Sequence, residues 1–242
     1  MTAQHTDDPR VDTRYVRTCS GTHDGGAVTI VGVVHDHPAS VYRVRHVVSE
    51  VDPSVLALEL PPLAVPLYEA YAAGARSPPA LGGELSAAVQ AAGTDSVVGI
   101  DGPSLGFVHT LGQRLWQERA SRTTVSRSLR SLLSVTKSAV ACRMAATLAA
   151  RTPFTVAVGS SVPHETTMDD PADEQAADER RQIRAASAVM DAFETSPSSR
   201  YRAESRERHM ADRLATLRES GDVVAVVGAG HFDPLCERVG TQ

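Results

Sequence analysis

Residues 28–35 read Val-Thr-Ile-Val-Gly-Val-Val-His, an apolar, β-branched run that ends in a histidine. The run has no polar alternation, which is typical of a strand buried on both faces of a parallel sheet. Valines at helical spacing then predict a helix from Pro38 to Asp52-Pro53. Residues 55–60, Val-Leu-Ala-Leu-Glu-Leu, indicate a second buried strand. The sequence therefore predicts a βαβ unit within an α/β fold, with a mainly parallel central sheet flanked by helices.

The rest of the chain continues this alternation. We expect helices at 67–73, 84–92, 104–150, 174–193 and 200–219, and strands at 97–101, 154–158 and 223–227. Residues 1–26 begin with a polar stretch and are expected to form a flexible lead-in. Residues 27–242 are expected to form a single domain, in which a helical insertion at about 105–219 precedes the last strand.

The composition restricts the partners. The 242 residues carry 24 basic and 29 acidic side chains, so no basic excess is present to attract a phosphate backbone. Aromatic residues make up only 4%, which argues against a base-stacking surface. Four basic residues interrupt the most apolar long stretch, 129–158. We therefore expect neither nucleic acid nor a membrane anchor, while a homo-oligomer stays open.

The cysteines indicate the compartment. Cys19, Cys142 and Cys236 are widely separated and form no CxxC pair. Neither a disulfide framework nor a thiolate zinc site is indicated, and a reducing environment fits. Because the N-terminus also lacks the apolar run of a secretory signal, the expected location is cytoplasmic.

Four apolar strands end close to a titratable side chain: His35, Glu59, Asp101 and His231. Ligands of open parallel sheets bind beyond the carboxyl ends of the strands, so these side chains are expected to converge on one pocket. Glu59 is the most informative, because a carboxylate between two leucines is costly to bury without a metal, a cation or several donors.

Each candidate also has an ordinary interpretation. Glu59 would be a surface carboxylate on an edge strand, and Asp101 would cap a turn. His37 is either an extra ligand or the cap of the following helix. The acidic run at 169–179 is most simply a solvated linker or helix face, although it could also repel anionic substrates.

His35 and His231 share the spacing GxxH, with Gly32 and Gly228 three residues before them. Glycine at this position would let a backbone or a ligand approach the imidazole closely. A third match ends at His109, in a segment that reads as helix, where a half-buried histidine is the simpler interpretation. The context therefore favours the first and last matches, which follow buried strands.

These ordered elements resemble the TraB/PrgY family, which is related to the TIKI proteins and, more distantly, to the erythromycin-esterase and ChaN-like group. Residues 32–35 and 53–60 are similar to the family's opening GxxH block and its strand ending in Glu-Leu. Residues 83–92 are similar to its G-x-E helix, 205–211 to its E-R-D-x-Y-M-A helix, and 223–231 to its closing GxxH strand.

The chain departs from the family pattern at several places. Gly102 follows Asp101 where the family often has arginine, and Ser205 replaces the usual glutamate of the late helix. Residues 105–199 match no motif. Many prokaryotic members continue into C-terminal membrane helices, so this chain is expected to be a soluble, trimmed member.

The resemblance implies a divalent-metal-dependent hydrolase. TIKI relatives are described as metal-dependent proteases that use the two GxxH histidines and the glutamate, and TraB/PrgY proteins are linked to the shutdown of peptide pheromones. Carried over to this chain, the metal ligands would be His35, Glu59 and His231. Two imidazoles and a carboxylate without a thiolate suit Mn, Co, Fe or Zn.

Three further residues complete the expected site. Glu59 is also the candidate general base, and Arg206 would orient the substrate or a neighbouring carboxylate. Glu84 and Asp101 would lie around the substrate or behind the ligands. The expected substrate is a peptide. The alternative is a non-catalytic regulatory protein that sequesters a peptide or a haem in the same cleft.

Overall fold

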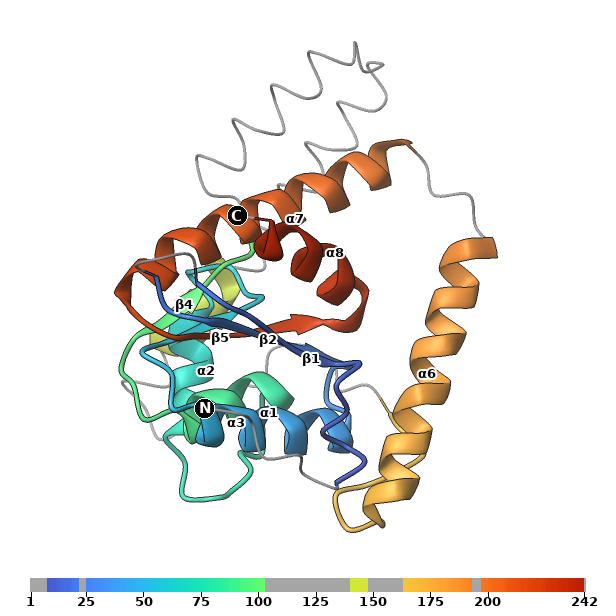
Figure 1. Ribbon diagram of the computed structural model, residues 1–242. Helices are drawn as coiled ribbons and strands as arrows, with labels where there is room; N and C mark the ends of the chain where they lie inside the picture. Colours follow the sequence, from blue (N-terminus) through green and yellow to red (C-terminus); the bar gives the residue numbers. More distant parts are fainter. Residues whose placement is uncertain (1–7, 22–24, 103–139, 148–162, 193–196, 242) are drawn as a thin grey trace.

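The computed structural model describes residues 8–21, 25–102, 140–147, 163–192 and 197–241. In this part of the chain, a five-stranded sheet lies between two layers of helices, which confirms the predicted α/β class (Figure 1). The strands, in their order across the sheet, are β1 (Val16–Cys19), β2 (Val28–Val33), β5 (Val223–Gly228), β3 (Val55–Leu58) and β4 (Val97–Gly99). The pairing of β1 with β2 is antiparallel, and the other three pairings are parallel.

The last strand of the sequence, β5, lies at the centre of the sheet between β2 and β3. Every residue of β2 and β3 is buried, as the β-branched runs predict. Val33 pairs with Gly228, and Leu58 pairs with Val226, so the three strands finish at the same edge. Residues that follow these strands are therefore brought together although they are far apart in the sequence.

Alternate residues of the strands point to two separate cores. On one face the sheet packs against α1 (Pro38–Val51) and α3 (Gly83–Ala91), with α2 (Val65–Ala72) beside α3. On the other face it packs against α7 (Pro197–Leu217) and α8 (Ala229–Gly240). The two cores are represented by Val31, Leu56, Val226 and Val48 on the first face, and by Ile30, Ala57, Val227, Leu214 and Leu235 on the second.

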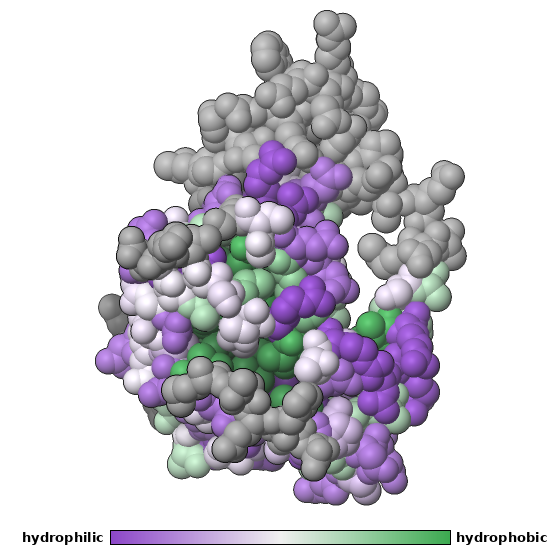
Figure 2. Space-filling model, viewed as in Figure 1, coloured by the Kyte–Doolittle hydropathy of each residue, from purple (hydrophilic) through white to green (hydrophobic). Residues whose placement is uncertain are grey.

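The long helix α6 (Ala172–Ala192) lies against α1, outside the sandwich of sheet and helices (Figure 1). On the face shown in Figure 2 it is mostly hydrophilic, as its many charged residues require. Residues 140–147 are helical, as predicted, and Ala145 and Ala146 pack against Leu67 and Tyr71 of α2. A 3₁₀ turn, Arg218–Ser220, leads from α7 into β5.

Two elements correct the sequence-based expectations. Residues 1–26 do not form only a flexible lead-in, because β1 within them pairs with residues Val28–Val31 of β2. A helix also follows β5 immediately, although none was expected after the last strand. Its apolar stripe, spaced i, i+3, i+4 and i+7, is Phe232, Leu235, Cys236 and Val239. Pro234 inside the helix hides this periodicity.

The predicted strand at 154–158 and most of the predicted helical stretch 104–150 lie outside the described residues. Among the helices that are described, none combines the length and the apolar character needed to cross a bilayer.

Candidate functional site

A cluster of charged side chains occupies the edge of the sheet where the parallel strands end. Glu59 follows β3, Asp101 follows β4, and Arg206 comes from α7. Arg206 donates from Nη2 to Glu59 Oε1 at 2.7 Å, and from Nε and Nη2 to the two oxygens of Asp101 at 2.9 and 2.7 Å. The second oxygen of Glu59 accepts from the Gly228 N–H at 2.7 Å. Glu59 is therefore the mostly buried carboxylate with a cation and a further donor that the sequence predicts, and Arg206 is the cation.

His231 lies in the first turn of α8, beside Glu59. Its Nε2 is 3.6 Å from Glu59 Oε1, and its Nδ1 is 3.3 Å from Glu207 Oε1. Glu207 comes from α7, is only 7% exposed, and also faces Arg238 at 3.7 Å. The sequence reasoning did not single out Glu207, although it directly follows Arg206.

His35 lies at the end of β2 and contacts a different carboxylate. Its Nδ1 is 2.7 Å from Glu84 Oε1, while Glu84 Oε2 accepts from the Asp36 N–H at 2.8 Å. The hydrogen bond with Glu84 raises the pKa of His35 to about 9, and the more distant charge of Glu59 acts in the same direction. Glu84 is 2% exposed, whereas the His35 side chain is 63% exposed. Glu84 thus supports the imidazole from behind instead of facing a substrate.

The two predicted histidines share one arrangement. Each directs Nδ1 to a buried carboxylate, His35 to Glu84 and His231 to Glu207, which leaves Nε2 as the nitrogen available to a ligand. This is the pattern by which proteins orient metal-binding imidazoles, so the donor chemistry suits a divalent ion. Within the described residues, however, no three His, Cys, Asp or Glu side chains are placed to hold one ion. In the arrangement seen, Arg206 occupies one oxygen of Glu59.

The pairing of His35 with Glu84 predicts a pH-dependent stability in metal-free protein. The pKa of His35 is raised in the folded state from 6.5 to about 9. The pair therefore stabilises the fold fully below about pH 6.5, and the contribution disappears as the pH rises through 9. We expect the free energy of unfolding to fall between these pH values in the wild type, and Glu84→Gln to remove this slope. Urea denaturation at several pH values, with a chelator present, measures it; the same slope in both proteins would contradict the prediction.

The two glycines of the GxxH pairs serve different purposes. A Cβ on Gly32 would lie 3.1 Å from the Phe232 ring, so this glycine lets α8 pack closely on β2 rather than opening space for a ligand. A Cβ on Gly228 would lie 3.5 Å from Glu59 Oε2, an ordinary contact, and Gly228 has a φ of −58°. We expect Gly32→Ala to lower the free energy of unfolding by about 1–3 kcal/mol. Gly228→Ala is expected to cost less than ~1 kcal/mol in the same urea titration, and equal losses would contradict this assignment.

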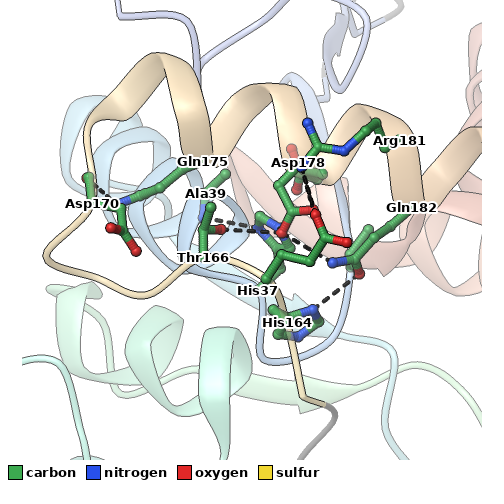
Figure 3. Close-up of polar contacts among 12 residues, drawn as sticks. His37, Ala39, His164, Thr166, Asp170, Gln175, Asp178, Arg181 and Gln182 are labelled. Carbon is green, nitrogen blue, oxygen red and sulfur yellow. Dashed lines mark hydrogen bonds and ion pairs between the residues drawn. The ribbon is translucent and has the colours of Figure 1, made fainter.

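The acidic run at 169–179 is partly buried. The prediction that it faces solvent is wrong for two of its acidic residues. Asp178 and Glu179 are 1% and 0% exposed. Glu179 accepts hydrogen bonds from Arg43 and Ser40 of α1. The partner of Asp178 is His37, whose Nε2 lies 3.2 Å away (Figure 3). Asp178 also accepts from Arg181 Nη2 at 3.1 Å, so each of these two carboxylates faces an arginine and adds little to the repulsion of anionic substrates.

His37 caps α1, which settles the two interpretations that the sequence left open. Its Nδ1 accepts from the Ala39 N–H at 3.1 Å, and its ring is fully buried. Burial lowers the pKa of His37, so the imidazole is neutral and its Nε2–H donates to Asp178. Both nitrogens are thus engaged within the protein.

A pocket of about 350 Å³ lies elsewhere on the molecule, between α1 and α3. Tyr42, His46 and Gln90 are among its lining residues, and it shares none with the strand-end cluster. The charged side chains converge at the strand ends, away from this pocket.

Comparisons of the chain with models of protein families, with curated proteins and with solved structures found no match.

Proposed function

We propose that this protein is a divalent-metal-dependent hydrolase that cleaves peptide bonds. The observation that carries the proposal is that both strand-end histidines contact a buried carboxylate through the same ring nitrogen. His35 and His231 each have a buried carboxylate on Nδ1, Glu84 and Glu207 respectively. A carboxylate there fixes the ring and raises the basicity of the opposite nitrogen.

The ligands would be His35, Glu59 and His231, and the ion would supply a water of lowered pKa and a polarised carbonyl group. An ion at His35 Nε2 would displace the proton of that nitrogen, while Nδ1–H would stay on Glu84, so metal affinity is expected to rise with pH. Mn, Co, Fe and Zn all suit this donor set.

Glu59, Arg206 and Glu207 would take the other roles in the reaction. Glu59, held by Gly228 N–H and Arg206, is a ligand or accepts the proton of the attacking water. Arg206 keeps Asp101 beside it, and its guanidinium, 34% exposed, can also meet the carbonyl or carboxylate oxygen of a peptide. Glu207 keeps His231 in one orientation.

The peptide substrate and the cytoplasmic location are parts of the same proposal. The resemblance to the TraB/PrgY and TIKI proteins supports a peptide as the substrate, with inactivation of a peptide signal as the biological outcome. Cys19, Cys142 and Cys236 are all free, which fits a reducing compartment.

Metal analysis of protein purified without chelator tests the proposal. We expect about one divalent ion per chain in the wild type and a strong loss in His35→Ala and in His231→Ala. His46→Ala, a change on α1 away from the strand ends, is the matched control and is expected to retain the ion. Equal metal content in all four proteins, or none in the wild type, would reject the metal site.

A second candidate function follows from the contact of Arg206 with Glu59. If this ion pair persists in solution, Glu59 is not free for a metal, and the cleft would sequester a peptide or a haem without turnover. Tight binding of peptides by chelator-treated protein, with no cleavage products on mass spectrometry, would favour this alternative.

A further inference from the structure

The loop between β2 and α1, which carries His35, is held from outside by a set of four side chains. We call this set the α6 clamp; it consists of His164, Thr166, Asp178 and Gln182. His164 Nε2 lies 2.9 Å from the backbone oxygen of His35, and His164 Nδ1 lies 3.0 Å from Gln182 Oε1. A dashed line in Figure 3 joins His164 to Gln182, and the rings of His164 and His37 meet edge-on with their centroids 4.8 Å apart. The clamp therefore touches the chain at His35 and again two residues later.

The α6 clamp is a connected network around one buried carboxylate, Asp178, and its other three members are partly exposed. Asp178 Oδ2 accepts from Thr166 Oγ1 at 3.1 Å and from Gln182 Nε2 at 3.2 Å. Because the Gln182 amide nitrogen is used in this way, its oxygen is the atom that faces His164. Both partners of the His164 ring are then oxygen atoms, so the ring donates to both only with a proton on each nitrogen.

The backbone of this loop contains one uncommon conformation. Asp36, between the two histidines, has a φ of 58°, in the left-handed region that a residue with a side chain rarely adopts. The Asp36 N–H donates to Glu84, the same carboxylate that holds the His35 ring. A change in the backbone of this loop would therefore move the imidazole away from its partner.

We infer that His164 is a positioning residue for His35, which it holds in place through the hydrogen bond to the His35 backbone oxygen. The inference rests on the proposed function, since the position of His35 matters for activity only if this histidine takes part in the site. The described segment that begins at residue 163 is thereby attached directly to the histidine loop.

The test compares His164→Phe, which keeps a ring against His37 but removes both hydrogen bonds, with Thr166→Val. The second variant removes a hydrogen bond of the same α6 clamp but touches nothing on His35. In histidine-labelled, chelator-treated protein at one fixed pH, the NMR signals of the His35 ring are assigned with His35→Ala. We expect His164→Phe to shift them toward the position of an unpaired imidazole, and Thr166→Val to leave them unchanged.

His164→Gln supplies the conservative control, because its amide nitrogen can replace Nε2 as the donor to His35. We expect this variant to restore the wild-type signals of His35, which separates positioning from a general loss of folding. Unshifted His35 signals in folded His164→Phe, or equal shifts in Thr166→Val, would overturn the inference.

Metal binding separates this inference from the proposed function. If the wild type takes up Mn²⁺ or Co²⁺, His164→Phe is expected to weaken the affinity by about 10-fold, and Thr166→Val to change it little. If the wild type takes up neither ion, the proposed function fails, while the comparison of His35 signals in metal-free protein still decides the role of His164.

Discussion

Replacing Glu179 with alanine is expected to lower the free energy of unfolding by about 3–5 kcal/mol, because it leaves the Arg43 guanidinium buried without a counter-charge. Arg43 is 1% exposed and Glu179 is fully buried, and Arg43 Nη1 also donates to Glu179 Oε1 at 3.0 Å. The same guanidinium donates to the backbone oxygens of Gly32 and Arg10, so it joins α6, α1 and β2. Urea denaturation at pH 7 measures the loss.

Two variants show whether burial causes this effect. Glu165→Ala removes an ion pair with Arg181 whose side chains are 76% and 57% exposed, and it is expected to cost less than ~1 kcal/mol. The double variant Arg43→Met, Glu179→Met leaves no unpaired charge, so it is expected to recover part of the loss. If Glu179→Ala costs no more than Glu165→Ala, the Arg43 pair is not the buried junction described above.

The Arg43–Glu179 pair also shows what the sequence cannot reveal. A run of acidic residues normally faces solvent, and Asp173 and Glu174 of α6 do so. The burial of Glu179 depends on Arg43, which lies 136 positions earlier in the chain. Nothing in the local pattern distinguishes an acidic residue with such a distant partner from its solvated neighbours.

The strands and the first helix could be predicted because their signals are local. A run of β-branched residues without alternation is buried on both faces wherever it lies, and Pro38 and Asp52 mark the ends of α1. By contrast, β1 has only four residues, and the two in the middle are exposed. The helix α8 contains Pro234, a residue that normally argues against a helix. Their stability comes from packing on a sheet that is assembled from distant segments.

The candidate site was predictable where the topology of the sheet alone determines it. Glu59, Asp101 and His231 follow parallel strands, and the structure brings them to one edge with Arg206. The carboxylates that contact the two histidines, Glu84 and Glu207, come from helices, and the direction in which a helical side chain points is not given by the topology of the sheet. Glu207 was therefore not distinguished from the other charged residues of its helix, whereas Glu84 lies behind His35, one of the two positions expected for it.

The largest expected effect on activity is that of Glu59→Gln, which keeps the shape of the side chain and removes its charge. The amide oxygen can still accept from the Gly228 N–H, and Arg206 keeps Asp101 as its partner, so the fold is expected to remain. A neutral amide neither takes a proton from water nor binds a divalent ion as a carboxylate does. We therefore expect peptide cleavage to fall by about 100-fold or more.

Glu69→Gln is the matched control for this change, because Glu69 is an exposed carboxylate on α2, outside the strand-end cluster. Initial rates on a peptide library, measured by mass spectrometry with metal added to each protein, are expected to be unchanged in this control. Retention of wild-type rates in Glu59→Gln would remove this carboxylate from the chemistry. Glu59 contacts both Arg206 and His231 at the ends of the parallel strands, so the proposed hydrolase would then lack its central base or ligand. The sequestering function would become the better account of the cluster.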